Sequence, residues 1–281
     1  MARVVCVHGV GQQFKGERVL HAQWCPALRD GVDRAGGALG PDDVRCVFYG
    51  DVFRSPGRPL SVGVPLFTAA DVDKGFEQEL LLAWWAEAAR TDPGVVDPDA
   101  RTLARTPRGV QAALRALSAS RFFSGLAIRM LIFDLKQVRL YLMDEDVRNE
   151  IQGRLAAAVD EETRVVVGHS LGSVVAYEGL AANKTWPVRS LVTLGSPLGV
   201  SFIHERLAER RPGTWPGSVE EWTNIADSGD VVALHKALAG RFGQPGRQVN
   251  DVAVHNGAHA HDVRPYLTSA ETGRAVLSGL R

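Results

Sequence analysis

A serine between two glycines is the first group in this chain whose setting favours chemistry. Residues 164–173 read RVVVGHSLGS, so Ser170 lies in a GxSxG pattern between Gly168 and Gly172. A serine at the tip of a tight strand-to-helix turn has a strained backbone, and only glycines beside it let the chain pass that closely. Such a turn presents one hydroxyl for nucleophilic attack. The alternative is an ordinary glycine-rich turn in a parallel sheet.

The residues around this turn favour the nucleophile. The run 165–167 is three valines, which is typical of a strand buried on both faces. Residues 171–183 carry leucine and valine at helical spacing. Strand, turn and helix therefore follow in the order that the motif requires, and Ser170 is the predicted nucleophile.

A serine nucleophile needs an imidazole to remove its proton and a carboxylate to fix the imidazole's tautomer. Two later segments offer such groups, each directly after a predicted strand: residues 223–235, TNIADSGDVVALH, and residues 254–266, VHNGAHAHDVRPY. The order serine, acid, histidine is that of α/β-hydrolases. The candidates are Asp227 and Asp230 as the acid and His255, His259 and His261 as the base.

Three sequence blocks carry a resemblance to a known family. VHGVG at residues 7–11, GHSLGS at 168–173 and SGDVVA at 228–233 resemble motifs of α/β-hydrolases, closest to intracellular lipase- or esterase-like serine hydrolases. HDVRPY at 261–266 is a looser fourth block. The resemblance implies hydrolysis of an ester or another acyl bond through an acyl-enzyme intermediate, without a metal or organic cofactor. It leaves the substrate open.

The resemblance also orders the candidates. It favours Asp230 as the acid, because this residue precedes a valine pair, with Asp227 as the second choice. It favours His261 as the base, because this residue precedes an aspartate and lies upstream of a tyrosine that opens the last helix, with His259 as the second choice.

An acyl-transfer site further needs donors for the negative oxygen of the tetrahedral intermediate. The motif implies the backbone N–H of Leu171 as one donor, and the HGVG loop implies that of Val10 as the other, with Gly11 as the alternative. His8 is expected to pack and hydrogen-bond beneath this loop and to take no part in the chemistry.

The HxxxHxH spacing of His255, His259 and His261 also suits a zinc site. However, Asn256 and Gly257 predict a turn inside the pattern, and no cysteine or glutamate cluster completes a ligand set. We therefore expect no metal.

The wider sequence predicts an α/β fold, with a mostly parallel central sheet flanked by helices, as one domain over residues 1–281. Between an early strand and the strand before Ser170, residues 54–145 read as a helical insertion, a candidate cap with helices at 76–90, 109–118 and 122–143. The helix at 145–159 is expected to cover the sheet. Further strands are expected at 4–7, 44–49, 190–194, 221–225 and 248–254, and further helices at 18–35, 231–239 and 266–280.

Composition narrows the partners. The 281 residues carry 32 basic and 32 acidic side chains, and this balance argues against a nucleic-acid partner. No apolar run is long enough for a signal peptide or a membrane span, and the three cysteines form no spacing motif. We expect a cytoplasmic protein, with peripheral membrane contact left open.

Together these features predict a serine esterase acting on a small-molecule or lipid-like acyl substrate. The same three groups would serve an amidase, a peptidase or a thioesterase. A prediction of another class is a noncatalytic α/β-hydrolase-like protein that binds a ligand or a partner.

Overall fold

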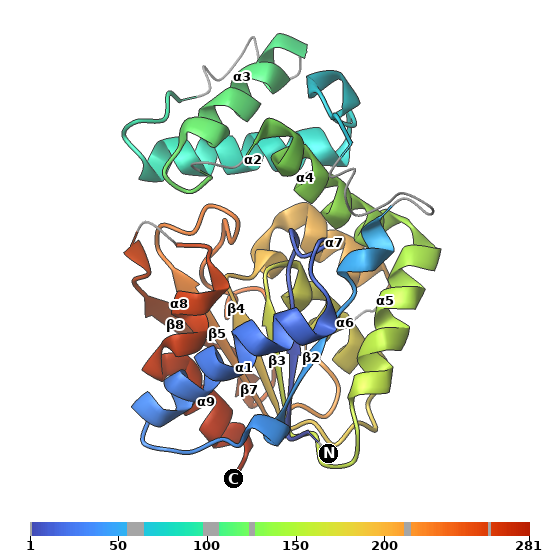
Figure 1. The fold of residues 1–281 in the computed structure, drawn as a ribbon, viewed down its shortest axis with the longest axis vertical. Helices are drawn as coiled ribbons and strands as arrows, with labels where there is room; N and C mark the ends of the chain where they lie inside the picture. Colours follow the sequence, from blue (N-terminus) through green and yellow to red (C-terminus); the bar gives the residue numbers. More distant parts are fainter. Residues whose placement is uncertain (1, 55–64, 98–106, 124–126, 211–214, 258–259) are drawn as a thin grey trace.

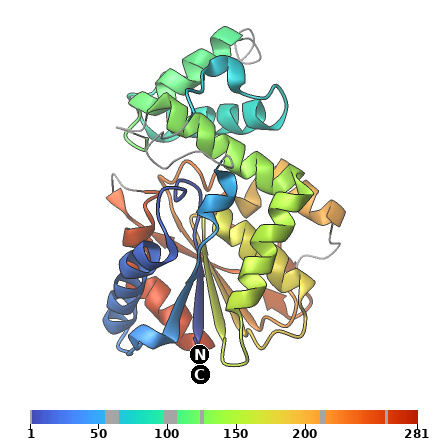
Figure 2. The ribbon, with the colours of Figure 1, turned by 45° about the vertical axis from the view of Figure 1, so that its right-hand side comes forward.

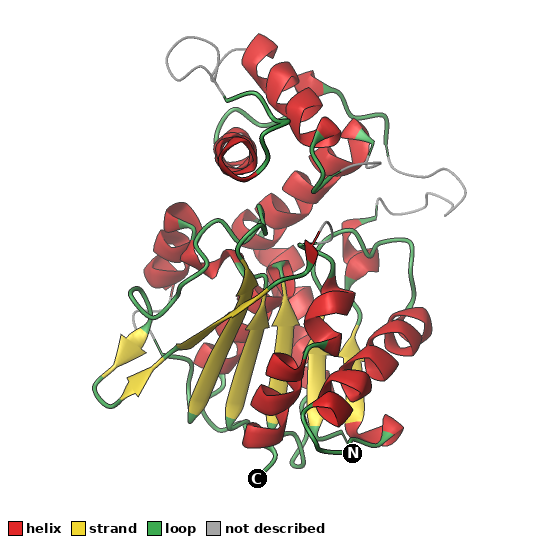
Figure 3. Cartoon of the chain, turned by 90° about the vertical axis from the view of Figure 1, so that its left-hand side faces the viewer, coloured by secondary structure: helices red, strands yellow, loops and turns green. Residues whose placement is uncertain are grey.

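Six parallel strands form the centre of the molecule and run with their carboxyl ends toward the same edge (Figure 3). The computed structural model describes residues 2–54, 65–97, 107–123, 127–210, 215–257 and 260–281. The six-stranded parallel sheet with its flanking helices confirms the predicted α/β class. In spatial order the strands are β2 (Val44–Val47), β1 (Val4–Val7), β3 (Val165–His169), β4 (Ser190–Leu194), β5 (Glu221–Asp227) and β8 (Asn250–Val254). A separate two-stranded ribbon pairs β6 (Gly243–Gln244) with β7 (Arg247–Gln248).

The strand before Ser170 is buried on both faces, as its valine run predicts. In β3, Val166 packs into the apolar core on one face of the sheet, and Val165 and Val167 pack into the core on the other. β-Branched side chains suit such a doubly covered strand. Packing on both faces therefore fixes the carboxyl end of the strand and the position of Ser170 beyond it.

Helices cover both faces of the sheet (Figure 1). The last segment differs from its prediction, because the helix expected at 266–280 is two helices separated at Ser269. The Ser269 side chain accepts a hydrogen bond from the Thr272 N–H and so caps the second helix. One face carries α1 (Glu17–Arg34), α8 (Val263–Thr268) and α9 (Ala270–Gly279), and the other carries α5 (Glu145–Ala158), α6 (Leu171–Ala182) and α7 (Ser201–Arg210).

A helical insertion follows β2, as predicted, and lies beyond the carboxyl ends of the strands (Figures 1 and 2). Its last helix runs down toward the sheet and is followed by α5. That helix begins at Ile128, later than the predicted residue 122, and Ala127 before it is extended. Its helices are α2 (Phe76–Thr91), α3 (Pro107–Ala119) and α4 (Ile128–Met143).

The predicted helix at 231–239 is wrong, since this segment consists of turns and irregular loop. The Asp230 carboxylate accepts from the N–H groups of Val232 and Ala233, which is the hydrogen-bonding pattern of a helix N-cap. The Asp251 carboxylate accepts from the N–H groups of Leu238 and Ala239, which a helix would bond to carbonyl oxygens four residues earlier. The Asp251 bonds therefore compete with a helix at the end of this segment.

Among the helices of the described residues, none combines the length and the apolar composition that crossing a membrane requires.

Candidate active site

Ser170 lies at a strained turn between β3 and α6. Its φ is 52° and its ψ is −127°, a left-handed conformation that a residue with a side chain rarely adopts. The two flanking glycines are needed for space. A Cβ at Gly168 would lie 2.6 Å from the Ser173 Cα, and a Cβ at Gly172 would overlap the carbonyl oxygens of Val7 and His8. The turn predicted from the GxSxG pattern is therefore present.

The carboxylate of Asp230 and the ring of His261 meet beside this turn. His261 Nδ1 lies 2.9 Å from Asp230 Oδ1 and 2.8 Å from Oδ2. Because a carboxylate only accepts hydrogen bonds, Nδ1 carries the proton in this pair. In the neutral imidazole Nε2 is then free to accept a proton.

Asp230 is fully buried and is surrounded by donors. Its Oδ1 accepts from the backbone N–H groups of Val232 and Ala233, and its Oδ2 accepts from the Tyr266 hydroxyl at 2.8 Å. Burial opposes ionisation of this carboxyl, but the neighbouring His261 and these hydrogen bonds hold its pKa below the usual value. Asp230 is thus kept as a carboxylate that faces an imidazole.

The other candidates for the acid and the base do not join the Asp230–His261 pair. Asp227 is buried, but its carboxylate binds the loop backbone, accepting from the N–H groups of Gly229 and Asn256. His255 is 87% exposed, and its Nδ1 lies 3.9 Å from Asp227 Oδ2. His259 lies outside the described residues. Among the described residues, no group of three histidine, cysteine or acidic side chains is arranged to hold a metal ion.

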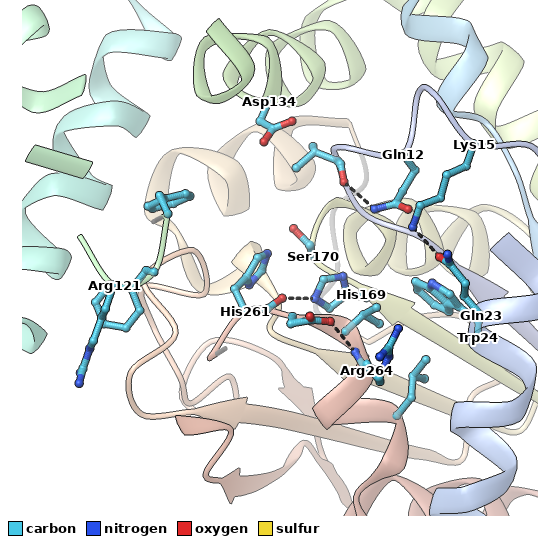
Figure 4. Close-up of a pocket in the computed structure, with 16 residues that line it drawn as sticks. Gln12, Lys15, Gln23, Trp24, Arg121, Asp134, His169, Ser170, His261 and Arg264 are labelled. Carbon is cyan, nitrogen blue, oxygen red and sulfur yellow. Dashed lines mark hydrogen bonds between the residues drawn. The ribbon is translucent and has the colours of Figure 1, made fainter. Parts of the chain in front are cut away.

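Ser170 and His261 line the same cavity without a hydrogen bond between their side chains (Figure 4). Proton-transfer contacts of this kind are often long in ligand-free enzymes and shorten when substrate binds. Ser170 itself is 2% exposed. The three groups predicted as nucleophile, base and acid are therefore brought to one place.

His169, inside the GHSLGS block, supports this arrangement and was missed by the sequence reasoning. Its Nε2 lies 3.0 Å from the His261 carbonyl oxygen, so it donates to that oxygen. The two rings lie 4.8 Å apart between centroids. Burial lowers the pKa of His169 to about 3, so the ring stays neutral. It fixes the loop that carries His261.

The loop after β1 passes directly beside the nucleophile. A Cβ at Gly9 would lie 2.6 Å from the Ser170 Cβ. Among the described residues, no group accepts a hydrogen bond from the backbone N–H of Val10 or from that of Leu171. Gly11 adopts a φ of 78°. The donors predicted for an oxyanion are thus unengaged next to Ser170.

His8 lies beneath this loop, as expected. Its Nδ1 donates to the Gly9 carbonyl at 2.6 Å, and its Nε2 accepts from the Tyr49 N–H at 3.1 Å. Its ring stacks on that of Tyr49 at 3.9 Å between centroids. Burial lowers the pKa of His8 to about 4, so the ring is neutral and both nitrogens are bound within the protein.

A cavity of about 830 Å³ opens over Ser170 (Figure 4). Its walls carry both polar and charged groups, among them Lys15, Asp262 and Arg264. A second, much smaller cavity of about 50 Å³ also reaches Ser170, and its lining is almost entirely apolar. The apolar residues that line it are Val10, Leu80, Trp84, Phe123, Val138, Leu171, Pro197, Ile203 and Val232.

The insertion contributes one acidic side chain to this site, Asp134 of α4, which the sequence reasoning did not single out. Figure 4 shows it across the cavity from Ser170. Burial raises its pKa to about 7, well above that of an ordinary aspartate. An acidic residue within the apolar stretch LIFDL was the available signal.

Comparison with protein-family models, with curated proteins and with solved structures finds no match for this chain.

Proposed function

We propose that this chain is a serine hydrolase of the α/β-hydrolase type, cleaving a carboxylic ester through an acyl-enzyme intermediate on Ser170. The observation that carries the proposal is the buried Asp230 bound to Nδ1 of His261 beside a serine in a strained turn. Parallel α/β sheets bind ligands at the carboxyl ends of their strands, and this cavity lies there.

In the first half of the proposed reaction, His261 Nε2 takes the proton of the Ser170 hydroxyl while Oγ attacks the ester carbonyl carbon. Asp230 stabilises the imidazolium that forms. The carbonyl oxygen becomes an oxyanion, and we assign the N–H groups of Leu171 and Val10 as its donors. Collapse of this intermediate breaks the bond to the alcohol oxygen, and His261 returns its proton to that leaving group.

In the second half, a water molecule gives a proton to His261 Nε2 and attacks the acyl carbon. A second tetrahedral intermediate forms on the same donors. Its collapse releases the carboxylic acid and returns the proton to Ser170 Oγ. No metal or organic cofactor enters these steps.

A fluorophosphonate probe and a p-nitrophenyl ester test the proposal. The wild-type protein should be labelled once and should cleave the ester, and Ser170→Ala should lose both properties. Ser228→Ala is the matched control, because this serine is exposed on the loop before Asp230. Full esterase activity in Ser170→Ala would exclude the mechanism. Absence of labelling in folded wild-type protein would favour the predicted alternative of a noncatalytic binding protein.

Amides, peptides and thioesters remain predicted alternatives, because the same groups attack any acyl carbon that the cavity accepts. A panel of matched ester, thioester and amide substrates separates them by relative kcat/KM. The cytoplasmic location likewise stays a prediction.

A further inference from the structure

The two cavities over Ser170 differ in the polarity of their lining residues, and Asp134 is among the residues that line both. Both are lined by Val10, Phe123, Asp134, Ser170 and His261. The narrow cavity suits a small apolar group, because all of its other lining residues are apolar. The wide cavity suits a polar group, because charged and amide side chains line it. Asp134 lies where an ester bound to Ser170 would pass from its apolar part to its polar part.

Asp134 has little to satisfy its carboxylate. Its Oδ1 accepts from Gln137 Nε2 at 3.2 Å, and no cation or backbone N–H among the described residues binds either oxygen. Asp134 Oδ2 is therefore available to a group inside the cavity. A carboxylate in such surroundings gains from any donor that a ligand brings.

A second acceptor lies on the wall of the wide cavity. Gln12 donates from Nε2 to the Val10 carbonyl at 3.4 Å, and its Oε1 is buried without a partner among the described residues. Buried side-chain oxygens are normally hydrogen-bonded, so an unpaired one at a cavity wall indicates a missing donor. Gln12 and Asp134 both lie on the upper side of the cavity in Figure 4.

We propose that Asp134 and Gln12 form a subsite that binds a hydrogen-bond donor, a hydroxyl or an ammonium, on the alcohol part of the ester. The substrate class is then an ester of a polyol or an amino alcohol with a small apolar acyl group. The inference rests on the proposed function. The acyl group enters the narrow cavity, and the alcohol part occupies the wide one.

Three butyrate esters test the subsite: 2-hydroxyethyl butyrate, 2-(dimethylamino)ethyl butyrate and propyl butyrate. Release of butyrate gives kcat/KM for each. The wild-type protein should prefer one or both of the first two esters over the propyl ester by roughly tenfold to a hundredfold, as a hydrogen bond to a charged acceptor gives. A stronger preference for the amino ester identifies an ammonium ligand, and one for the hydroxyethyl ester identifies a hydroxyl.

Asp134→Leu should abolish this preference, which is measured within the variant as the ratio of kcat/KM between the esters. Asp134→Asn keeps the size of the side chain and one acceptor, so it should lose the preference for the ammonium and retain part of that for the hydroxyl. It also covers the case in which the leucine variant does not fold. Asp33→Asn is the control, since this exposed carboxylate of α1 lines neither cavity, and it should leave the ratios unchanged.

Equal ratios in the wild type and both Asp134 variants would overturn the subsite, as would a wild-type preference for propyl butyrate or for an ester with an anionic alcohol part. These outcomes differ from a failure of the proposed function, in which none of the esters is cleaved and the fluorophosphonate does not label Ser170.

Discussion

Two carboxylates belong to the candidate site, and their environments push their pKa values apart: Asp230 lies behind His261, and Asp134 lines the cavity. Asp230, at the edge of the sheet, is buried, yet its pKa is below the usual value. Asp134, on the insertion, is partly buried at the cavity wall and has its pKa raised to about 7. Burial acts in the same direction on both groups. The difference lies in the donors: Asp230 has two backbone N–H groups, a tyrosine hydroxyl and an imidazole, whereas Asp134 has one amide.

The two carboxylates differ in how many of their hydrogen-bond donors the protein itself supplies. The sheet edge supplies all the partners of Asp230 from the protein itself, which suits a group that must hold one imidazole in one orientation. The insertion leaves Asp134 with an unbound oxygen that faces the cavity. In the proposed function, residues at the carboxyl edge of the sheet carry out the reaction, and Asp134 of the insertion binds the alcohol part of the ester.

The largest expected effect comes from neutralising the acid at the sheet edge. Asp230→Asn should lower kcat for ester cleavage roughly a thousandfold to ten-thousandfold, because an amide no longer holds the reactive tautomer of His261. Steady-state kinetics on a p-nitrophenyl ester measures it. Asp227→Asn is the matched control, since Asp227 is equally buried but accepts its hydrogen bonds from loop backbone and makes none with His261. If Asp227→Asn lost more activity than Asp230→Asn, the two acids would have to exchange roles.

The next effect concerns the turn that carries the nucleophile. Gly172→Ala should lower the free energy of unfolding by about 2–3 kcal/mol, because its Cβ would overlap backbone oxygens at the end of β1. Chemical denaturation measures the loss. Gly153→Ala is the control, because this glycine lies in α5 with no neighbouring atom near its would-be Cβ, and it should raise stability by about 0.5–1 kcal/mol. Equal stability of the two variants would contradict the tight turn.

A smaller effect should follow removal of one donor from Asp230. Tyr266→Phe removes the hydroxyl that donates to Asp230 Oδ2 and accepts from the Asp227 N–H at 2.8 Å. We expect kcat to fall roughly tenfold, as the loss of one hydrogen bond to a charged group would cause. The activity limb that depends on the carboxylate should also move to higher pH, since a donor that lowers the pKa of Asp230 is gone. A variant with an unchanged pH profile would show that Tyr266 acts only in packing.

The sequence predicted the site residues at the carboxyl ends of the strands much better than those of the insertion. The strand, turn and helix around Ser170 follow from local spacing, because valine and glycine have strong conformational preferences there. Asp230 and His261 were ordered by resemblance, and the structure brings them together. By contrast, residues 231–239 do not form the predicted helix, because the distant Asp251 carboxylate binds the N–H groups of Leu238 and Ala239 that a helix would use.

Asp134 is an example of a site residue that the sequence alone does not predict. Its neighbours along the chain predict only an apolar helix with one acidic residue. Whether that acid faces solvent, the helix interface or the cavity depends on how α4 lies across the strand ends, which no local pattern specifies. His169 and Tyr266 stood inside recognised blocks, but their hydrogen bonds join segments far apart in the chain.

The smallest expected effect is on the free energy of unfolding, and it tests whether the Asp134 carboxylate lacks hydrogen-bond donors. Its pKa is raised from 3.8 to about 7, so the folded protein binds more protons than the unfolded chain between these values, and wild-type stability falls as pH rises through this window. Asp134→Asn removes this contribution. Below the window the two proteins should have similar stability, and above it the variant should be more stable by about 1–2 kcal/mol, less than the full shift implies because water reaches the cavity.

Urea denaturation of both proteins across this pH range measures the difference, and Asp33→Asn, an exposed carboxylate of α1, is the control. A constant offset between Asp134→Asn and the wild type would mean that Asp134 already has its partners. In that case the contrast with Asp230 would disappear, because both carboxylates would be satisfied by the protein alone. A gain that grows with pH and shrinks when an amino-alcohol ester analogue is bound would instead tie the missing donor to the substrate.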